Sequence, residues 1–477
     1  MKSYCPNCKI IFFVTLFFGL FGLPKSSWAA TYYVRTDGHD TASGANDTND
    51  SSTGAFRTFQ KCHDTATTGD TCLIDPGDYS SANTTLTTTT PRITFRKNGS
   101  GTVTVGSIVI TSDNVTIDGV TSVKTVGSYP TNIWVGTNFK SVTGVTVTNC
   151  RIVSGYEHSE ATAGLRFYGG GNIVSNTTFD GDYLNGHDFY YGLLFMTGNG
   201  NTVLNNIFTG MREFDAIIWF SAGNNHLVEN NTIYNISASL RGYHQDFMQL
   251  YVGPSTGNII DGNIIYNSPG LQIGSIEPSD GTGENAQNWI MRNNIFVASS
   301  ALFLGGKGWT IVNNDFYEVG GSGAYALYLY KNTGSDASNA VIKNNAFIGC
   351  GEDDDYNGWY LLIGSPTGVD ADYNYVTKTA AASYGVKSGW SEMHGVSAGD
   401  PKFVAPFTDC VENNCDFRLQ TKSPMIDKGI SIATWANPLN RAGVSRPQGT
   451  AADIGAYEDL QKGDTTPPAA PTGLSVN

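Results

Sequence analysis

The sequence predicts an all-β protein in which parallel strands stack as a solenoid. Two Asn residues, or close equivalents, repeatedly precede an apolar or β-branched pair, at intervals of roughly 20 to 32 residues. Examples are Asn205-Asn206-Ile207-Phe208, Asn230-Asn231-Thr232-Ile233 and Asn293-Asn294-Ile295-Phe296. Each interval holds short alternating apolar runs separated by Gly and Asn, without helical periodicity. One such coil cannot bury its own apolar face, but stacked coils fill a continuous interior.

The repeated Asn residues suit the tight turns between strands, because Asn tolerates the left-handed backbone conformation. An Asn stacked above an Asn also predicts a ladder of amide hydrogen bonds along the solenoid. Self-alignment gives the coil register: residues 190–206 match residues 215–231 without a gap at an offset of 25. Asp215 then matches Asp246 at an offset of 31, and Asn231 matches Asn263 at 32.

The first element, residues 1–29, has the features of a secretory signal. Two lysines precede a short apolar run over residues 10–23, and Ser27-Trp28-Ala29 supplies small residues for cleavage. No later stretch is long and apolar enough to span a membrane. We therefore expect an exported protein, secreted or at the cell surface.

Composition and charge restrict the partners. Only 15% of the 477 residues are charged and 56 are Gly, which excludes a coiled coil and a charged disordered chain. The net charge of −14 becomes −17 when three lysines leave with the signal. We therefore expect no nucleic-acid partner, and we expect a monomer.

The cysteines fall into three groups. Cys5 and Cys8 leave with the signal. The close pairs Cys62 with Cys72 and Cys410 with Cys415 predict two local disulfides in an oxidising compartment. Cys150 and Cys350 follow strand-like stretches, where we expect buried free thiols.

The opening of the mature chain resembles that of secreted right-handed parallel β-helix proteins of the pectate-lyase-like superfamily. The resemblance rests on Tyr32-Tyr33-Val34, on Phe56-Arg57-Thr58-Phe59-Gln60-Lys61 and on residues 69–79 (GDTCLIDPGDY). It implies a right-handed parallel β-helix over residues 30–380, with a short capping helix from Thr58 to Ala66. The superfamily includes lyases, hydrolases, epimerases, tailspikes and adhesins, so the resemblance leaves the activity open.

The C-terminal part carries a second resemblance. Residues 381–460 are similar to the module that closes many bacterial β-helix proteins before a surface-sorting element, through residues 400–404, 416–419, 423–429 and 453–458. Residues 461–477 read as a Pro-rich linker that leads into an incomplete segment similar to the first strand of a fibronectin type III domain.

Titratable residues are densest on the three aligned coils: Asp188, Arg212, Glu213, Asp215, Arg241, His244 and Asp246. The offsets of 25 and 31 place Asp188, Glu213 and His244 at one stack position. They place Tyr190, Asp215 and Asp246 at the position two residues later. Residues two apart share a strand face, so we expect a solvent-facing row of carboxylates with one imidazole, at about 4.8 Å per coil.

A short sequence motif on the third coil also predicts a functional site there. Residues 243–249 (YHQDFMQ) resemble an H-x-D-x-x-Q signature of β-helix proteins that act on acidic polysaccharides. The resemblance implies functional roles for His244, Asp246 and Gln249. Gln249 has the opposite parity to Asp246, so it needs a β-bulge to join the same face.

Three activities fit this predicted surface, and we favour a lyase that cleaves uronic-acid polysaccharides by β-elimination. Such a lyase needs a base and a group that neutralises the carboxylate. We expect His244 as the base, with Arg241 or Lys307 as alternatives, and Asp246 and Asp215 orienting it or holding a cation. Arg212, Arg241 or a calcium ion on Asp188 and Glu213 meets the carboxylate, and Tyr190, Gln249 and Lys307 contact the substrate.

Two alternatives remain open. A glycoside hydrolase needs two carboxyl groups, about 5 to 5.5 Å apart for a retaining mechanism. Asp215 and Asp246, one coil apart in this alignment, fit that spacing loosely. The other alternative is a non-catalytic, adhesin-like surface protein that binds glycan or calcium, in which the His244 and Asp246 pair is structural.

Overall fold

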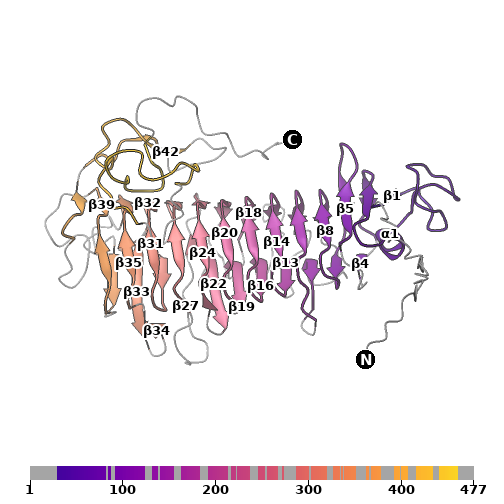
Figure 1. The fold of residues 1–477 in the computed structure, drawn as a ribbon, viewed down its shortest axis with the longest axis horizontal. Helices are drawn as coiled ribbons and strands as arrows, with labels where there is room; N and C mark the ends of the chain where they lie inside the picture. Colours follow the sequence, from indigo (N-terminus) through magenta and orange to yellow (C-terminus); the bar gives the residue numbers. More distant parts are fainter. Residues whose placement is uncertain are drawn as a thin grey trace, which may run out of the picture.

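The computed structural model shows coils stacked along one long axis (Figure 1). It describes residues 29–81, 84–86, 92–123, 131–137, 140–154, 163–182, 192–212, 216–221, 223–236, 245–252, 255–266, 271–272, 286–299, 302–319, 326–332, 335–336, 338–350, 361–364, 367–377, 392–397, 399–406, 415–432 and 440–459. Among these residues, no helix has the length and apolar character needed to cross a membrane.

Three parallel sheets run along the stack. Sheet A consists of β1 (Thr31–Val34), β2 (Thr71–Ile74), β5 (Thr94–Lys97), β8 (Thr116–Asp118), β11 (Thr146–Thr148), β14 (Ile173–Ser175), β17 (Thr202–Leu204), β20 (Leu227–Glu229), β24 (Ile259–Asp261), β28 (Ile290–Arg292), β31 (Thr310–Val312), β35 (Val341–Lys343) and β38 (Asp370–Asp372). Sheet B consists of β3 (Gly77–Tyr79), β6 (Val103–Val105), β9 (Thr121–Val123), β12 (Arg151–Val153), β15 (Thr178–Asp180), β18 (Ile207–Met211), β21 (Thr232–Ile236), β25 (Ile264–Ile265), β29 (Ile295–Val297), β32 (Asp315–Tyr317), β36 (Ala346–Ile348), β39 (Tyr375–Val376) and β40 (Val396–Ser397).

Sheet C is shorter. It consists of β4 (Thr84–Leu86), β7 (Ile108–Ile110), β10 (Thr131–Val135), β13 (Ala163–Tyr168), β16 (Gly192–Thr197), β19 (Ala216–Ser221), β22 (Gln245–Val252) and β26 (Leu271–Gln272). Small additional sheets are formed by β23 (Ser255–Thr256) with β27 (Ala286–Gln287), by β30 (Leu302–Leu304), β33 (Leu327–Asn332), β34 (Ser335–Asp336) and β37 (Leu361–Gly364), and by β41 (Phe403–Ala405) with β42 (Asp416–Leu419).

The chain passes from sheet A to sheet B through a tight Asn turn and from sheet B to sheet C through a longer connection. Inward side chains of all three sheets form one continuous core. Like residues stack in it: the Phe179 and Phe208 ring centroids lie 4.8 Å apart, and so do those of Phe316 and Phe347. This architecture confirms the predicted solenoid. Strand β40 still pairs with β39, so the helical stacking continues beyond the predicted boundary at residue 380.

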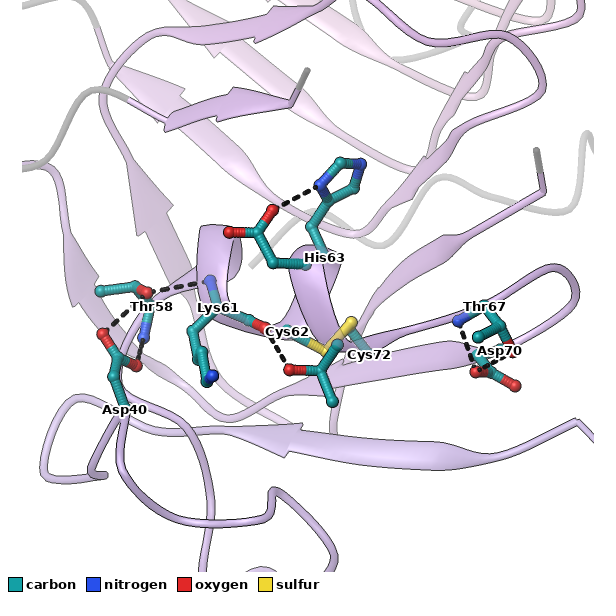
Figure 2. The surroundings of a disulfide bond; sticks show 10 residues. Asp40, Thr58, Lys61, Cys62, His63, Thr67, Asp70 and Cys72 are labelled. Atoms are coloured by element: carbon teal, nitrogen blue, oxygen red, sulfur yellow. Dashed lines mark hydrogen bonds and ion pairs between the residues drawn. A yellow bond between two sulfur atoms is a disulfide. The ribbon is translucent and has the colours of Figure 1, made fainter. Parts of the chain in front are cut away.

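A short helix and a disulfide close the first coils, as predicted (Figure 2). Helix α1 (Phe59–Thr65) begins after Thr58, whose side chain accepts a hydrogen bond from the Lys61 N–H, and ends at Ala66. Cys62 on the helix is bonded to Cys72 on β2, with a Cα–Cα distance of 6.2 Å. Cys150 and Cys350 are buried and free, as expected. Cys415 is disulfide-bonded, and its predicted partner Cys410 lies outside the described residues.

The predicted amide ladder occupies the turns from sheet A to sheet B. The backbone N–H and the Nδ2 of each Asn donate to the Oδ1 of the Asn one coil further on, for example from Asn263 to Asn294 at 2.9 Å. The rungs are Asn206, Asn231, Asn263, Asn294, Asn314, Asn345 and Asn374. Glu392 accepts from Asn374 and caps the last rung. The residue before each rung is commonly an Asn with positive φ, such as Asn205 at 55°.

A second, shorter ladder lies in the turns from sheet C to sheet A, and one of its rungs is a histidine. The His226 Nδ1 accepts a hydrogen bond from the Asn201 backbone N–H at 3.1 Å. The backbone N–H of His226 donates to the Asn258 Oδ1 at 2.8 Å. His226 is therefore neutral, with its proton on Nε2. His226 is only 1% exposed, because the imidazole takes the place of an Asn inside the ladder.

The register of sheet C differs from the gapless alignment. Val203 pairs with Val228, so the offset of 25 holds in sheet A. In sheet C, Phe195 pairs with Trp219, an offset of 24, and Ala216 pairs with Asp246, an offset of 30. The coil that contains β19 has one extra residue between its sheet C strand and its sheet A strand. A β-bulge after Phe220 adds another residue in β22.

The C-terminal segment packs on the outer face of sheet B, at the end of the stack where β39 lies (Figure 1). Its apolar residues, among them Phe403, Phe417 and Met425, join a cluster with sheet B residues such as Val297 and Tyr375. We call residues 399–459 the closing segment. It covers the later coils of sheet B only.

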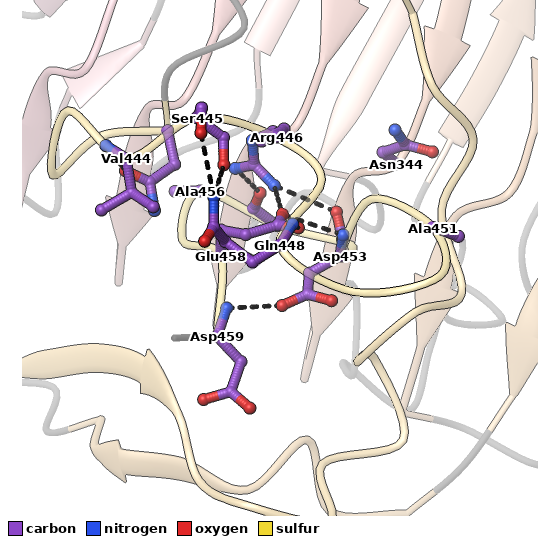
Figure 3. Close-up of polar contacts among 12 residues, drawn as sticks. Asn344, Val444, Ser445, Arg446, Gln448, Ala451, Asp453, Ala456, Glu458 and Asp459 are labelled. Carbon is purple, nitrogen blue, oxygen red and sulfur yellow. Dashed lines mark hydrogen bonds and ion pairs between the residues drawn. The ribbon is translucent and has the colours of Figure 1, made fainter. Parts of the chain in front are cut away.

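A buried ion pair organises the interior of the closing segment (Figure 3). The Arg446 Nη1 donates to the Glu458 Oε2 at 2.9 Å, and both side chains are almost completely buried. Asp315 reaches this interior from sheet B and accepts the Ala456 N–H at 3.2 Å. Burial raises the pKa of Asp315 to about 7. Gly455, with a φ of 97°, lies against the Asp315 Oδ1 and leaves no room for a Cβ atom.

Candidate functional site

The outer face of sheet C carries a row of aromatic and cationic side chains. In β10, β13 and β16 the residues Ile133, Leu165 and Leu194 point inward and are fully buried. Their neighbours Trp134, Arg166 and Phe195 are only partly buried, so they lie on the opposite, outer face. The register pairs Trp134 with Arg166 and Arg166 with Phe195. One residue from each of three consecutive coils therefore forms this row.

The guanidinium of Arg166 lies between two rings. Its central carbon is 5.8 Å from the centroid of the Trp134 ring and 5.3 Å from that of Phe195. Tyr168, two residues further along β13, shares the outer face, and its hydroxyl accepts from the Arg166 Nη1 at 3.4 Å. The Tyr168 ring lies 5.9 Å from both the Trp134 and the Phe195 rings. We call these four residues the platform.

The rings hold the cation in place. A guanidinium near an aromatic face gains about 0.5 to 1 kcal/mol at an exposed position and about 2 kcal/mol when water is excluded. The two aromatic faces and the phenolic hydroxyl of Tyr168 favour one orientation of the Arg166 side chain. A guanidinium is a planar donor group whose geometry matches a carboxylate.

The same face is closed further along the stack, at β22. Gln249 pairs with Trp219 and so continues the outer row, but it is only 8% exposed. Phe247, which shares its parity, is fully buried. Within the described residues the Gln249 Oε1 is buried and accepts no hydrogen bond. The outer face of sheet C is thus partly exposed at β10 to β16 and buried at β22.

Asp246 lies on the other side of β22. It shares its parity with Met248 and Leu250, which belong to the core, and it is fully buried. Its register partner on β19 is Ala216, and on β26 it is Gln272. The predicted stacking of Asp215 on Asp246 was therefore wrong by one residue. The predicted bulge also fails to bring Gln249 and Asp246 together, because it follows Gln249 and leaves the two on opposite faces.

Residues 135–268 match the family model described as "Right handed beta helix region". The chain is a right-handed parallel β-helix. No curated protein sequence matches it.

Solved structures share the fold. The PL6 family alginate lyase AlyGC matches with a TM-score of 0.55 and 14% identity over 86% of this chain and 60% of that chain. XylC in complex with xylose matches with a TM-score of 0.56 and 10% identity over 90% of this chain and 98% of that chain. The PL6 family polysaccharide lyase Pedsa3628 from Pseudopedobacter saltans matches with a TM-score of 0.51 and 16% identity over 75% of this chain and 93% of that chain. This chain thus spans less than two thirds of the length of AlyGC. At such low identities, the TM-scores indicate a shared fold only.

The other predicted site residues of this β-helix are scattered or lie outside the described residues. Arg212 directly follows β18, where the chain leaves sheet B for sheet C. Lys307 follows β30 in the connection that leads to sheet A. Its backbone forms an isolated parallel β-bridge with Gln287. The structure does not bring these two cations together. Six predicted residues lie outside the described residues: Asp188, Tyr190, Glu213, Asp215, Arg241 and His244.

The calcium prediction stays a prediction. Among the described residues, no group of three or more His, Cys, Asp or Glu side chains is placed to hold a metal ion. The two residues that we expected to ligate calcium, Asp188 and Glu213, are outside that part of the chain.

Sequence reasoning missed the platform. The signal was present, since Ile133-Trp134-Val135 and Leu165-Arg166-Phe167 each place one large residue between two core residues, shortly before a Gly. Aligning the two triplets directly on one another places Trp134 beside Arg166, as in the observed register. The predicted site residues are the carboxylates, the histidine and the cations of the later coils, so this arginine among aromatic residues is not one of them.

Proposed function

We propose that this protein is a polysaccharide lyase that acts on uronic-acid polymers along the outer face of sheet C. The observation that carries the proposal is Arg166, a guanidinium between two aromatic rings on the outer face of sheet C. Aromatic faces suit the C–H surfaces of pyranose rings, and a fixed guanidinium suits a uronate carboxylate. The two lyases that share the fold support the same class of reaction.

The reaction requires three operations. A base removes the proton at C5, the C4–O4 bond breaks, and a C4=C5 double bond forms in the ring that keeps the carboxylate. The departing O4 takes up a proton, and a cation stabilises the charge that develops on the carboxylate. We propose His244 as the base and Arg241 or Arg212 as the cation. Asp188 and Glu213 would hold a calcium ion that serves the same purpose.

Asp246 takes a different role in this proposal from the one that the sequence suggested. Because it is buried with inward parity, it does not face a sugar on the outer side of the sheet. It would instead act as a positioning residue at the start of β22, next to the segment that carries His244. The hydrolase alternative loses support, because Ala216 rather than Asp215 pairs with Asp246.

Ultraviolet absorbance tests the proposal, because only elimination creates a new C=C bond conjugated with the carboxylate. We would incubate the protein with alginate, pectate and a neutral xylan, each with calcium and with a chelator. We expect absorbance to rise on a uronate polymer and to stay flat when His244→Ala is used. New reducing ends without absorbance would contradict a lyase and indicate a hydrolase, whereas neither signal would leave a glycan-binding protein.

A further inference from the structure

We infer that the closing segment is a pH-gated cover on the outer face of sheet B. It is held most tightly in acid and is released more readily at neutral and alkaline pH. The group that gates it is Asp315 on β32, whose carboxyl group reaches from sheet B into the interior of the closing segment. Because this cover lies on sheet B and the proposed binding face lies on sheet C, neither depends on the other.

Backbone and amide groups make polar contacts between the closing segment and the coils. The Asn344 side chain bonds both the N–H and the carbonyl of Ile430, each at 2.9 Å. The Gly455 N–H donates to the Asn344 carbonyl at 2.8 Å, and the Arg441 Nε donates to the Gly262 carbonyl at 3.1 Å. None of these contacts involves a group that changes its charge between about pH 4 and pH 9, so they hold the segment equally over that range.

Asp315 differs from these contacts because it carries a titratable group into an apolar interface. Its register partners are Ile295 on β29 and Ala346 on β36, which are both buried. Asp315 is itself completely buried, and its Oδ2 accepts a hydrogen bond from the Ala456 N–H at 3.2 Å. Its Oδ1 has no partner among the described residues and lies against Gly455. An ionised carboxylate is costly in such surroundings, so the carboxyl group is protonated while the segment is closed.

The cation that faces Asp315 is already neutralised. Arg446 lies in the interior of the closing segment, where its Nη1 donates to the Glu458 Oε2 at 2.9 Å (Figure 3). Its Nη2 donates to the Gly455 carbonyl at 2.7 Å. Because the charges of Arg446 and Glu458 cancel, an ionised Asp315 would be an uncompensated buried charge. Burial accordingly raises the pKa of Asp315 to about 7, although the Ala456 N–H and the charge of Arg446 both act to lower it.

A second buried carboxyl group lies in the same interior. Asp453 accepts the backbone N–H groups of Asp427 and Asp459, at 2.8 and 2.6 Å. Burial raises the pKa of Asp453 to about 7 as well. All three residues belong to the closing segment, so Asp453 keeps these partners when the segment leaves sheet B. The proton on Asp453 is therefore linked to the fold of the closing segment, whereas the proton on Asp315 is linked to its docking.

The proton on Asp315 couples docking to pH. Its pKa is about 7 while the segment is closed, and release returns the carboxyl group to water, where its pKa is about 4. A raised pKa stabilises the closed state fully below the lower value, and this stabilisation is lost as the pH rises toward the higher one. The equilibrium constant for release therefore rises by up to about tenfold per pH unit between about pH 4 and pH 7 and is then level. Tyr317 and Tyr375 also contact the closing segment, but burial raises their pKa values above 10, so both stay neutral over this range.

Release of the closing segment uncovers an apolar area on sheet B. Val297, Ile348 and Tyr375 are buried in the cluster that they form with Phe403 and Phe417 of the closing segment. When the segment leaves, these sheet B side chains face water, although the coils beneath them keep their strand pairing. The gate therefore controls how much apolar surface the β-helix exposes as the pH changes.

Hydrogen exchange followed by mass spectrometry measures the release. Peptides from residues 440–459 report on the closing segment, and peptides from residues 92–118 report on the first coils. The wild type and Asp315→Asn are compared at the same pH, so that the intrinsic exchange rates cancel. Asn has the size of Asp, keeps an oxygen for the Ala456 N–H and carries no charge at any pH, so it reproduces the protonated form of the gate.

We expect exchange over residues 440–459 in the wild type, relative to that in Asp315→Asn, to increase about a hundredfold from pH 5 to pH 8. Over residues 92–118 the ratio of the two proteins should be the same at both pH values. An unchanged ratio over residues 440–459 would overturn the inference. A ratio that rises equally over residues 92–118 would also overturn it, because the proton on Asp315 would then be linked to unfolding of the whole β-helix.

Two glycine substitutions test the gate without altering Asp315. Gly455 and Gly443 have positive φ values of 97° and 79°, so Ala strains the backbone at both positions. A Cβ atom on Gly455 would collide with the Asp315 Oδ1, whereas nothing lies within 4 Å of a Cβ atom on Gly443. Over residues 440–459, Gly455→Ala should exchange faster than the wild type at pH 5, with a smaller difference at pH 8. Gly443→Ala should differ from the wild type equally at both pH values, and the same pattern in both variants would contradict a gate at Asp315.

Discussion

The turns from sheet A to sheet B and the outer face of sheet C repeat with very different fidelity. In the turns, the same residue type occupies the same place in seven coils, and each amide bonds the next at 2.9 to 3.0 Å. In sheet C, the residues that share one register position are Trp134, Arg166, Phe195, Trp219 and Gln249. The turns keep Asn at the same place because each rung is hydrogen-bonded to the rungs of the neighbouring coils.

The difference separates stability from binding. A ladder rung is buried, and both its donors and its acceptor are used by the protein itself. An outward residue on sheet C packs on one side only, so its identity is not fixed by the core. The regular region therefore holds the coils in register, and the irregular region is where a ligand can be recognised. Substitutions in the turns should lower stability with little effect on binding. Substitutions on the outer face of sheet C should lower binding with little effect on stability.

The largest loss of stability should come from the middle of the ladder. In Asn294→Ala, Asn263 loses the acceptor for its backbone N–H and its Nδ2, and the Ile260 carbonyl loses a donor. Because buried polar groups without partners cost about 1 to 3 kcal/mol each, we expect the unfolding free energy to fall by about 3 kcal/mol. Urea unfolding measures this, with the outward Thr232→Ala on sheet B as the control. A loss equal to that of the control would contradict the account of the ladder.

Loss of the disulfide between Cys62 and Cys72 should have the next largest effect. The two residues are only 10 positions apart, so the bond closes a small loop and contributes about 2 to 3 kcal/mol. Cys62→Ser with Cys72→Ser should lower the thermal midpoint without changing binding to alginate. Because the bond lies at the capped end of the stack, a change in alginate binding would show that the two ends of the protein are coupled.

A smaller effect should depend on pH and involve Asp315. Its pKa is raised to about 7 by burial, so the folded protein retains this proton after the unfolded chain has lost it. The resulting contribution to stability declines as the pH rises from about 4 to about 7 and is then level, with a slope of at most about 1.4 kcal/mol per pH unit.

Asp315→Asn should therefore flatten part of the pH dependence of the thermal midpoint. Asp453, whose pKa burial also raises to about 7, is present in both proteins, so the difference between them isolates Asp315. Parallel curves for the two proteins between pH 4 and pH 7 would show that the Asp315 carboxyl is not the group involved.

The smallest effect on stability should come from the platform. Arg166 and Phe195 are partly buried and their backbones are held by sheet C, so Arg166→Gln should lower the unfolding free energy by about 1 kcal/mol through its lost cation–π contacts. The same urea experiment measures it. A loss as large as that of Asn294→Ala would mean that the platform is structural, and the contrast between the two regions would disappear.

The sequence predicts the ladder well because each rung is a local signal that recurs. Asn206, Asn231 and Asn263 each stand before a short apolar strand, and their side chains stack as the repeat implies. The capping helix and the first disulfide are also local, and both were predicted correctly.

Sheet C is harder to predict because its register depends on insertions in turns. One extra residue between Phe220 and the Gly223 turn leaves the Asn positions aligned but moves the strand by one place. A shift of one residue sends every side chain to the opposite face. This shift is why Ala216, and not Asp215, pairs with Asp246. The buried position of His226 has no such local signal, since nothing in its sequence surroundings distinguishes a buried rung from an exposed turn.

Hydroxyl-radical footprinting with a uronate hexasaccharide tests the central claim most directly, because it reports on individual aromatic side chains. The account predicts that the sugar protects Trp134, Tyr168 and Phe195 from oxidation and leaves Tyr234 on sheet B unchanged. A neutral xylohexaose should protect the same rings less. Protection of Tyr234 without protection of the platform would contradict the claim that the outer face of sheet C is the binding surface.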